Sequence, residues 1–560
     1  MISFQATRPG VQSLQPAVPA RKPALEITGL TIELPAGADR PYAVKDLSIS
    51  IYPGETACIV GESGSGKSLA ALATMRLLPK SIKATAGTVM LHGRDLLKIS
   101  EADMRSVRGQ EIGMVFQEPL TALNPVMRVG KQIEEVLEVH GVGSKAERTR
   151  RALELITEVG LPDPERIIKA YPHQMSGGQR QRVMIAMALA LEPTLLIADE
   201  PTTALDVTTQ AQILKLIGQL RKKHNMAVMF ITHDFGVVSE IADRVIVMRH
   251  GERVEEGTVQ EVLKNPQHAY TKQLLDAVPT MAPPERRSIA DVDALVITGL
   301  TKTYGERQLF SPKRTVHAVQ NVSFTIRRGE TLGLVGESGS GKSTVGRCII
   351  RLVEPDGGSI RVGNHDFESL SQRQLRPQRR RVQMVFQDPF GSLDPRRTIG
   401  ATICEGMVAN GVSREEARGK AADLLELVGL KAVAIDRYPH EFSGGQRQRV
   451  GIARALALEP EILIADEAVS ALDVSVQAQV LQLLRDVQAR LGVAILFVTH
   501  DLRVATQMCD RIAVMRKGQL VELKETKELL AAPEHEYTRN LLSAIPGHEL
   551  ACAAGTALQS

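Results

Sequence analysis

The sequence predicts an α/β protein that contains two copies of one domain in tandem, each built on a mainly parallel β-sheet. An identical stretch occurs twice, at 61–68 and at 336–343. Short apolar segments alternate with helix-patterned segments in each half, which is typical of parallel sheets. Lys67 recurs as Lys342 and Glu200 as Glu467, and from the stretch before Glu200 onward the two halves stay in register. The repeat spans about half of the chain, far more than a solenoid unit, so it indicates a duplicated domain.

The repeated stretch fits G-x-x-x-x-G-K-[ST], the pattern of loops that bind nucleotide phosphates. Glycines let backbone N–H groups point at phosphate oxygens, and the helix that follows adds positive potential. We expect Lys67 and Lys342 to reach the β- and γ-phosphates of ATP, and Ser68 and Ser343 to bind Mg²⁺. The predicted ATP-binding residues are Gly61, Glu62, Ser63, Gly64, Ser65, Gly66, Lys67 and Ser68, then Gly336, Glu337, Ser338, Gly339, Ser340, Gly341, Lys342, Ser343 and Thr344.

The repeat divides the chain into two domains, which we expect at residues 24–279 and 294–546. The stretch 280–293 between them carries prolines and charges and is predicted to be a linker. Residues 1–23 lack the apolar run of a signal peptide, and we expect a flexible tail there. Residues 547–560 are expected to be a second flexible tail.

The first half begins with a segment, 24–51, in which apolar and polar residues alternate. This alternation predicts an antiparallel sheet. Apolar residues at helical spacing predict helices within 129–160 and at 180–191. Buried strands are predicted at 56–60, 194–199 and 227–232, and at 331–335 in the second half.

The composition limits where the protein acts. Lys+Arg 68 against Asp+Glu 64 gives a net charge of +4, too small and too dispersed to indicate binding of nucleic acid. No apolar run reaches the roughly 18 residues of a membrane span, so we expect a soluble, cytoplasmic protein that reaches a membrane only through partners. The five cysteines lack metal or disulfide spacing. They are Cys58, Cys348, Cys404, Cys509 and Cys552.

Polar residues follow the predicted strands of each half, at the sheet edge where ligands of such folds bind. Asp199 ends one strand and is placed to hold Mg²⁺, usually through water. Glu200 comes next and is the candidate general base for an attacking water. His233 follows another strand and is expected to contact the γ-phosphate and orient that water. The corresponding residues of the second half are Asp466, Glu467 and His500.

Two further motifs resemble those of ATP-binding cassette ATPases, in the order typical of that family and over about residues 24–546. The signature motif is represented by Ser176-Gly177-Gly178-Gln179 and Ser443-Gly444-Gly445-Gln446. The family also carries glutamine loops, represented by Gln117 and Gln387, and the stretches that end in Asp206 and Asp473. The resemblance implies two cassettes, each with a mainly parallel sheet core, an antiparallel β subdomain and a helical signature subdomain.

The same resemblance implies how the cassettes work together. They would pair head to tail and enclose ATP between the phosphate loop of one and the signature of the other. Lys67 would then share an ATP with Ser443, and Lys342 with Ser176. Gln117 and Gln387 would complete the Mg²⁺ ligands, and Asp206 and Asp473 would belong to the nucleotide sites. The aromatic residue that stacks on adenine is left open between Tyr42 and Tyr304, because their distances from the two loops differ.

The end of each half has a narrower resemblance, to the C-terminal extension of dipeptide, oligopeptide and glutathione importer ATPases. It rests on the segments 268–275 and 535–542, which share a His-x-Tyr-Thr-x-x-Leu-Leu pattern. The resemblance implies two transmembrane permease subunits, docked on 117–130 and 387–400, and an extracytoplasmic solute-binding protein. It places the chain on the cytoplasmic face of the inner membrane. Many single-cassette relatives carry a cysteine cluster for an iron–sulfur centre, which neither half has, so no such centre is expected.

Two other functions are compatible with tandem cassettes. A soluble ATPase acting on ribosomes or DNA would need a long charged arm or zinc-binding cysteine pairs, and the short linker and scattered cysteines argue against it. A nucleotide-binding scaffold without turnover would not need Glu200 and Glu467, which are both intact. An importer motor with two hydrolytic sites is therefore the favoured hypothesis.

Overall fold

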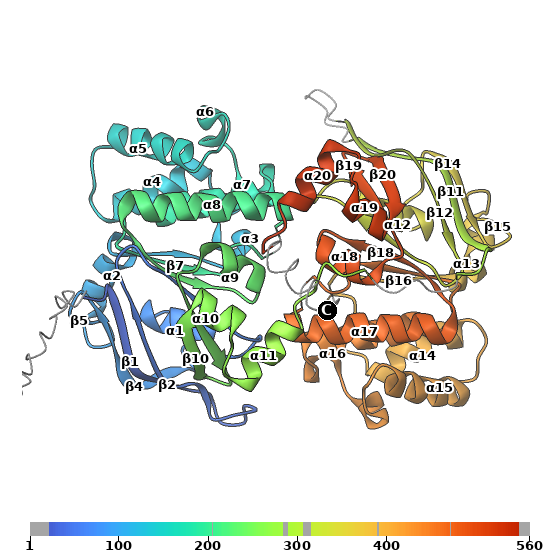
Figure 1. Cartoon of the computed structure of the whole chain (residues 1–560), viewed down its shortest axis with the longest axis horizontal. Helices are drawn as coiled ribbons and strands as arrows, with labels where there is room; N and C mark the ends of the chain where they lie inside the picture. The colour runs from blue at the N-terminus through green and yellow to red at the C-terminus, as the bar shows by residue number, and fades with distance from the viewer. Residues whose placement is uncertain are drawn as a thin grey trace, which may run out of the picture.

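The computed structural model describes residues 22–203, 205–283, 289–305, 315–388, 391–470 and 472–547. Two halves of the same architecture lie side by side, with the second rotated so that it runs head to tail with the first (Figure 1). The expected tails lie almost wholly outside the described residues, as do residues 284–288 of the expected linker.

Each half is built around a six-stranded sheet with the same strand order, β6-β7-β8-β3-β9-β10 and β16-β17-β18-β13-β19-β20. All neighbours pair in parallel except the last two, which are antiparallel. The first sheet comprises β3 (Thr56–Val60), β6 (Ile112–Val115), β7 (Leu195–Asp199), β8 (Ala227–Ile231), β9 (Arg244–Arg249) and β10 (Glu252–Thr258). The second comprises β13 (Thr331–Val335), β16 (Val382–Val385), β17 (Ile462–Asp466), β18 (Ala494–Thr499), β19 (Arg511–Arg516) and β20 (Gln519–Glu525).

A four-stranded antiparallel sheet covers one side of each half, as the alternation in 24–51 predicts. In the first half the order is β2 (Tyr42–Ile51), β1 (Leu25–Glu33), β4 (Lys83–Leu91) and β5 (Arg94–Asp95). In the second half it is β12 (Thr315–Arg327), β11 (Asp293–Gly305), β14 (Gly357–Val362) and β15 (His365–Asp366).

Helices cover the other side; the helices expected within 129–160 are present, and the range of the helix expected at 180–191 is corrected. The pattern over 129–160 is divided into α4 (Val129–Val139) and α5 (Lys145–Glu158), because Gly141 and Gly143 adopt φ of 67° and 65°. The helix expected at 180–191 is α7 (Gly177–Ala188), which starts earlier because Ser176 caps it.

Most of the remaining helices repeat between the halves. The phosphate loops open α1 (Lys67–Thr74) and α12 (Lys342–Ile349). The counterparts of α4, α5 and α7 are α14 (Ile399–Ala409), α15 (Arg414–Leu427) and α16 (Gly444–Leu456). The others are α2 (Glu101–Gln110), α3 (Pro119–Ala122), α6 (Pro164–Ile167), α8 (Val207–His224), α9 (Phe235–Ile241), α10 (Val259–Lys264), α11 (Ala269–Asp276), α13 (Gln372–Gln378), α17 (Val474–Leu491), α18 (Leu502–Met508), α19 (Thr526–Ala531) and α20 (Glu536–Ser543).

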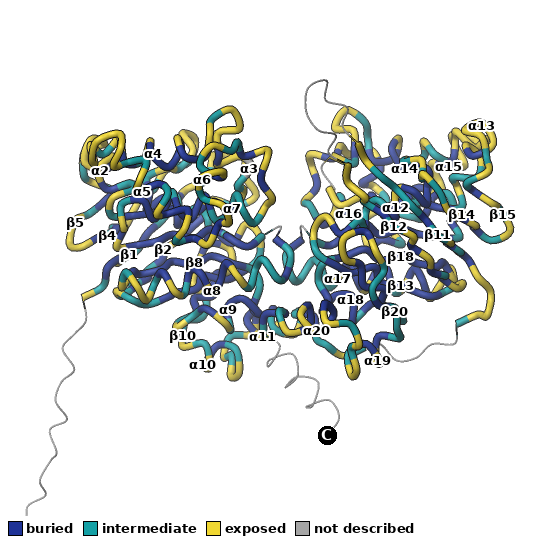
Figure 2. The backbone as a smooth tube through the Cα atoms, turned by 90° about the horizontal axis from the view of Figure 1, so that it is seen from above, coloured by how far each residue is buried: buried dark blue, intermediate teal, exposed yellow. Residues whose placement is uncertain are grey.

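The six-stranded sheet is buried on both faces, which explains the continuous apolar runs of its strands. Alternate residues of β3 enter two separate hydrophobic clusters. Ala57 and Ile59 face the antiparallel sheet, whereas Cys58 and Val60 face the helical layer. The interior of both halves is accordingly buried in Figure 2. Burial on both sides holds the carboxyl ends of the strands, and the loops that follow them, in fixed positions.

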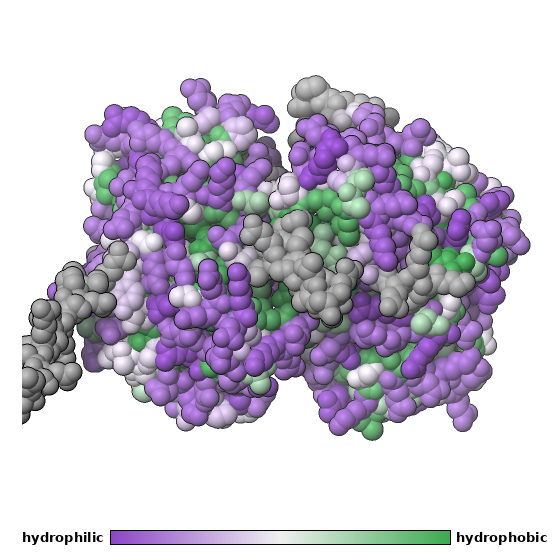
Figure 3. All heavy atoms as spheres, in the orientation of Figure 1, coloured by the Kyte–Doolittle hydropathy of each residue, from purple (hydrophilic) through white to green (hydrophobic). Residues whose placement is uncertain are grey.

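The two halves meet along the middle of the molecule. Val207, at the start of α8, packs into the hydrophobic core of the second half, as Met281 does from just beyond α11. Gln507 Nε2 in α18 lies 3.2 Å from Thr280 Oγ1. On the face shown in Figure 3 the outer surface is largely hydrophilic, and apolar residues gather toward the junction. Within the described residues, no helix combines the length and apolarity needed to cross a bilayer.

Candidate functional site: two paired nucleotide sites

The two phosphate loops have the same conformation. Gly66 and Gly341 precede the helices α1 and α12 with φ of 103° and 106°, a region that favours glycine. A Cβ on Gly66 would lie 2.4 Å from the carbonyl oxygen of Ala43, and one on Gly341 would lie 2.1 Å from that of Ala318. The pattern requires glycine here because the loop turns tightly against β2 or β12.

The loop lysines are buried and held by their own loops. Lys67 Nζ donates to the carbonyl oxygens of Gly61 and Glu62 at 2.7 Å and 2.8 Å. Lys342 makes the same two contacts in the second half, at 2.8 Å and 2.9 Å. Burial lowers the pKa of Lys67, against the raising effect of nearby carboxylates. Each loop therefore contains a fixed ammonium group beside the N-terminus of a helix, which is suited to phosphate binding.

The residues expected to hold Mg²⁺ lie together in both halves. Ser68 Oγ donates to Asp199 Oδ1 at 2.9 Å, and Ser343 Oγ donates to Asp466 Oδ1 at 2.8 Å. Burial raises the pKa of both aspartates, an effect that a divalent cation would oppose. A hydroxyl and a carboxylate beside a phosphate loop form the hard oxygen donor set that Mg²⁺ prefers, with phosphate and water as further ligands. The residues present therefore fit this ion.

Glu200 is the centre of a cluster of predicted site residues. It accepts a hydrogen bond from Gln117 Nε2 at 2.9 Å, and its other oxygen lies 3.3 Å from His233 Nδ1. Thr203 Oγ1 donates to it at 2.9 Å. Burial raises the pKa of Glu200, but the hydrogen bond and charge of His233 outweigh burial and hold that pKa at about 2. Glu200 is thus ionised at neutral pH, as a general base must be.

The second half repeats this cluster with one difference. Glu467 accepts from Gln387 Nε2 at 2.6 Å and lies 3.4 Å from His500 Nδ1. Ser470 replaces Thr203 and donates to the Glu467 backbone carbonyl instead of the carboxylate. Both glutamates adopt a positive φ, 45° for Glu200 and 48° for Glu467, which is unfavourable for a residue with a side chain. Strain of this kind at matched positions is typical of functional sites.

The side chains of Gln117 and Gln387 hydrogen-bond to the two glutamates, and not to the aspartates expected to hold Mg²⁺. In the family resemblance they were expected to ligate Mg²⁺, whereas here their amide nitrogens bind the carboxylates of Glu200 and Glu467. Their role as metal ligands stays a prediction.

Each phosphate loop also contacts the opposite half. Thr208 Oγ1 at the start of α8 donates to Glu337 Oε1 in the second loop at 2.8 Å. Ser475 Oγ at the start of α17 donates to Glu62 Oε1 in the first loop. Asp206 and Asp473 cap these two helices, and Asp206 acts electrostatically on Lys342 as Asp473 does on Lys67. Both nucleotide sites are therefore built from both halves.

A cavity of about 950 Å³ occupies the second site. Its lining combines Lys342 and Gln387 of the second half with Thr203, Leu205 and Asp206 of the first. Among the described residues, those that line this cavity do not include the signature motif. The pairing of Lys342 with Ser176, and of Lys67 with Ser443, therefore stays a prediction.

The signature residues instead begin the helices α7 and α16. Ser176 Oγ accepts from the Gln179 N–H at 3.3 Å, and the Gln179 side chain accepts from the Ser176 N–H at 3.0 Å. Ser443 and Gln446 form the same reciprocal cap. Gly177, Gly178, Gly444 and Gly445 form the first turns, with N–H groups of the kind that bind anions.

The C-terminal extensions hold the phosphate loops, a role that the sequence did not reveal. Tyr270 in α11 accepts a hydrogen bond from the Glu62 N–H at 3.2 Å, and Tyr537 in α20 accepts from the Glu337 N–H at 3.1 Å. Both rings are buried and lie beneath an arginine, Arg249 in the case of Tyr270. The recurrence of tyrosine in register with the candidate general bases Glu200 and Glu467 was the signal for this role.

The register of the repeat adds a candidate for the aromatic contact with adenine. When the phosphate loops are superposed and the alignment is extended upstream without a gap, Tyr42 corresponds to His317 rather than to Tyr304. His317 lines the cavity of the second site, whereas Tyr304 is not part of the described lining and lies near Lys302, 5.7 Å from its Nζ to the ring centre. His317 is therefore a further candidate for the adenine contact at the second site, and the contacts of Tyr42 and Tyr304 with adenine stay predictions.

Comparison with known proteins agrees with this architecture. A family model described as ABC transporter matches residues 44–203 and 319–470, and one described as Oligopeptide/dipeptide transporter, C-terminal region, matches 254–297 and 521–553. The glutathione import ATP-binding protein GsiA of Escherichia coli (strain K12) is 48% identical over 93% of this chain and 89% of its own length. The protein of the same name from Salmonella paratyphi A gives the same figures. A solved dimer of an ATP-binding cassette with ADP and Pi is 31% identical over 41% of this chain and 98% of its own, with a TM-score of 0.38.

The chain belongs to the ABC transporter family, with two cassettes and two C-terminal regions of the oligopeptide/dipeptide type in one polypeptide. It is an ATP-binding ATPase of that family, which confirms the predicted fold and enzyme class. As such it acts with membrane permease subunits in a transporter complex.

Proposed function

We propose that this chain is the motor subunit of an importer, and that it couples ATP hydrolysis at two sites to the uptake of peptide-like solutes such as dipeptides, oligopeptides or glutathione. The observation that carries the proposal is the C-terminal region at the end of both halves, together with 48% identity along nearly the whole chain to glutathione import ATP-binding proteins. The two cassettes correspond to residues 24–279 and 294–546.

The geometry supports the following division of work at the first site. Lys67 and the N-terminus of α1 bind the β- and γ-phosphates. Ser68 and Asp199 hold Mg²⁺, which supplies neutralisation of phosphate charge when it is bound. Glu200 accepts the proton of a water as the water oxygen attacks the γ-phosphorus and ADP leaves. His233 lies beside the Glu200 carboxylate, and it is expected to contact the γ-phosphate and orient the attacking water.

The second site uses Lys342, Ser343, Asp466, Glu467 and His500 in the same roles. ATP bound at both sites is expected to bring each signature motif onto the γ-phosphate held by the opposite loop. Hydrolysis removes that shared contact and lets the halves separate, which is a switch driven by the γ-phosphate.

The importer requires partners that the chain itself does not contain. We infer two transmembrane permease subunits, docked on 117–130 and 387–400, and an extracytoplasmic binding protein that delivers the solute. In the first docking segment Val126 is 82% exposed, which suits an apolar contact with a partner. The chain would then lie on the cytoplasmic face of the inner membrane.

The test expresses the gene with its neighbouring permease and binding-protein genes in a strain that lacks peptide and glutathione uptake. Labelled glutathione and a set of dipeptides are offered, and ATP-dependent accumulation of at least one is expected. Lys67→Ala and Lys342→Ala should each abolish it, while Lys45→Ala, which removes an exposed lysine paired with Glu252, should not. Uptake of an unrelated solute with none of these peptides would overturn the proposed substrate class.

A further inference from the structure

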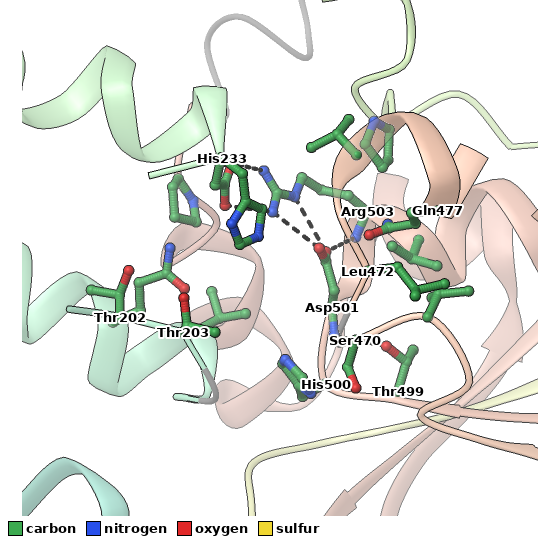
Figure 4. A pocket seen from close by; sticks show the side chains of 18 of the residues that line it. Thr202, Thr203, His233, Ser470, Leu472, Gln477, Thr499, His500, Asp501 and Arg503 are labelled. Carbon is green, nitrogen blue, oxygen red and sulfur yellow. Dashed lines mark hydrogen bonds and ion pairs between the residues drawn. The ribbon is translucent and has the colours of Figure 1, made fainter. Parts of the chain in front are cut away.

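The two segments that carry the catalytic histidines are joined by one arginine. Arg503 lies shortly after His500 in the chain and extends toward the segment of His233 in the other half (Figure 4). There it contacts Asp234, the residue after His233. Its Nη1 and Nη2 donate to the two carboxylate oxygens of Asp234 at 3.1 Å and 3.0 Å. Its Nε and Nη2 also donate to the two oxygens of Asp501 at 3.2 Å and 3.0 Å. One planar guanidinium thus binds one carboxylate from each half.

Both aspartates fix the positions of the histidine segments. Asp234 accepts from the Gly236 N–H at 2.8 Å and caps α9, and Asp501 accepts from the Arg503 N–H at 2.8 Å and caps α18. Each aspartate directly follows its histidine in the chain. Movement of either histidine segment therefore pulls on the guanidinium that holds the other.

The connection is asymmetric, and the first half is shaped for it. In the register that aligns Glu200 with Glu467, Arg503 corresponds to Gly236. A Cβ on Gly236 would lie 2.8 Å from Arg503 Nη1 and 2.6 Å from the Pro546 carbonyl oxygen. The absence of a side chain at 236 makes room for the arginine of the other half and for the end of its C-terminal extension.

The surroundings strengthen the connection. Arg503 and Asp234 have only 12% and 19% of their side chains exposed, so water screens the pair weakly. The group lines a small cavity of about 110 Å³ between the halves, together with both histidines and with Thr203 and Ser470, which contact Glu200 and Glu467. Residues of both nucleotide sites therefore lie around the same small cavity as Arg503 and its two aspartates.

We propose that Arg503 is a positioning residue that couples the two ATP sites by joining the segments that carry His233 and His500. The proposal rests on the proposed function, in which both sites hydrolyse ATP. When ATP draws His500 toward the second γ-phosphate, Arg503 carries Asp234 with it and favours the active position of His233. Occupancy of one site then promotes turnover at the other.

The test isolates turnover at the first site and varies occupancy of the second. In Glu467→Gln the second site binds ATP without hydrolysis, whereas in Lys342→Ala it does not bind. The ratio of kcat/KM between these two variants, measured in the assembled transporter, is the coupling factor. We expect a factor of about five or more with Arg503 present, and a fall toward one in the Arg503→Ala background.

Companion variants separate coupling from folding. Gly236→Ala keeps Arg503 but displaces its guanidinium, and should lower the coupling factor in the same way. Arg503→Lys, whose ammonium lacks the planar fork, should restore part of it. Arg511→Ala removes a comparable ion pair, with Glu330, inside the second half and should leave it unchanged.

One outcome would refute the coupling role of Arg503, and a different outcome would refute the proposed function with two hydrolytic sites. A coupling factor that stays the same in both the Arg503→Ala and Gly236→Ala backgrounds would refute the role of Arg503. If Glu467→Gln and Lys342→Ala both hydrolyse ATP at the full rate of the unmodified protein, the proposal of two hydrolytic sites fails instead.

Discussion

Removal of the hydroxyl groups of Tyr270 and Tyr537 is expected to weaken ATP binding at both sites. Tyr270→Phe keeps the buried ring beneath Arg249 and deletes only the acceptor for the Glu62 N–H. A buried hydrogen bond contributes about 0.5–1.5 kcal/mol net, and the distances of 3.2 Å and 3.1 Å lie toward the long end of the normal range. We therefore take about 1 kcal/mol for each site, which corresponds to a roughly five-fold increase in Kd for ATP.

The assay compares the KM and kcat of ATP hydrolysis in the assembled transporter, and the Kd of a fluorescent ATP analogue on the purified chain. KM and Kd should rise about five-fold for each single variant, because the loop loses part of its phosphate-binding conformation. The kcat should change little, since neither hydroxyl contacts Glu200 or Glu467 in the described hydrogen bonds. Tyr52→Phe is the matched control, because Tyr52 also lies near an arginine, Arg244, without a hydrogen bond to Glu62 in the described structure. Unchanged KM and Kd in both loop variants would refute the idea that the C-terminal extensions position the loops.

Three further predictions concern catalysis, acid stability and metal content. Glu200→Gln and Glu467→Gln should each lower ATP turnover at the altered site by about 10²-fold where general-base catalysis limits the rate, and a variant with unmodified total turnover would show that its site is not catalytic. Burial raises the pKa of Asp234, but the charge and hydrogen bonds of Arg503 outweigh burial and hold that pKa at about 2. Its stabilising effect is therefore present above the ordinary value of 3.8 and is lost as the pH falls toward 2. The unfolding temperature should consequently fall less steeply below about pH 4 in Asp234→Asn than in the unmodified protein, and equal slopes would contradict this reasoning. Anaerobically purified protein should show neither iron–sulfur absorbance nor stoichiometric iron, because such centres need several thiolate ligands, and detection of either would refute the expectation.

The strands and loops of the fold were predictable because they depend on local chemistry. A continuous run such as 56–60, without alternating polar residues, must be buried on both faces, and the glycines of the adjoining loop permit a tight turn. The break between α4 and α5 was harder to predict, since apolar spacing continues through 129–160 and only Gly141 and Gly143 mark the interruption.

The catalytic candidates were also predictable, because each follows a strand and recurs in both halves. The sequence did not reveal contacts that form only when distant segments meet. The hydroxyl of Tyr270 reaches Glu62 across 208 residues, and Arg503 reaches Asp234 across 269. His317 occupies the position that corresponds to Tyr42, and this could have been found by aligning the two halves at their phosphate loops. A search for a tyrosine upstream of the second loop finds Tyr304 instead.

The single arginine at the junction has a consequence for which cassettes can associate. Two copies of the first half, facing each other in the same geometry, would bring together two Asp234 carboxylates with no cation between them. Two copies of the second half would bring two Arg503 side chains into a space that Gly236 leaves open for only one. Both like pairs are therefore disfavoured, by repulsion in one case and by crowding in the other. The unlike halves recognise each other, and the covalent linkage between them supplies the correct partner to each.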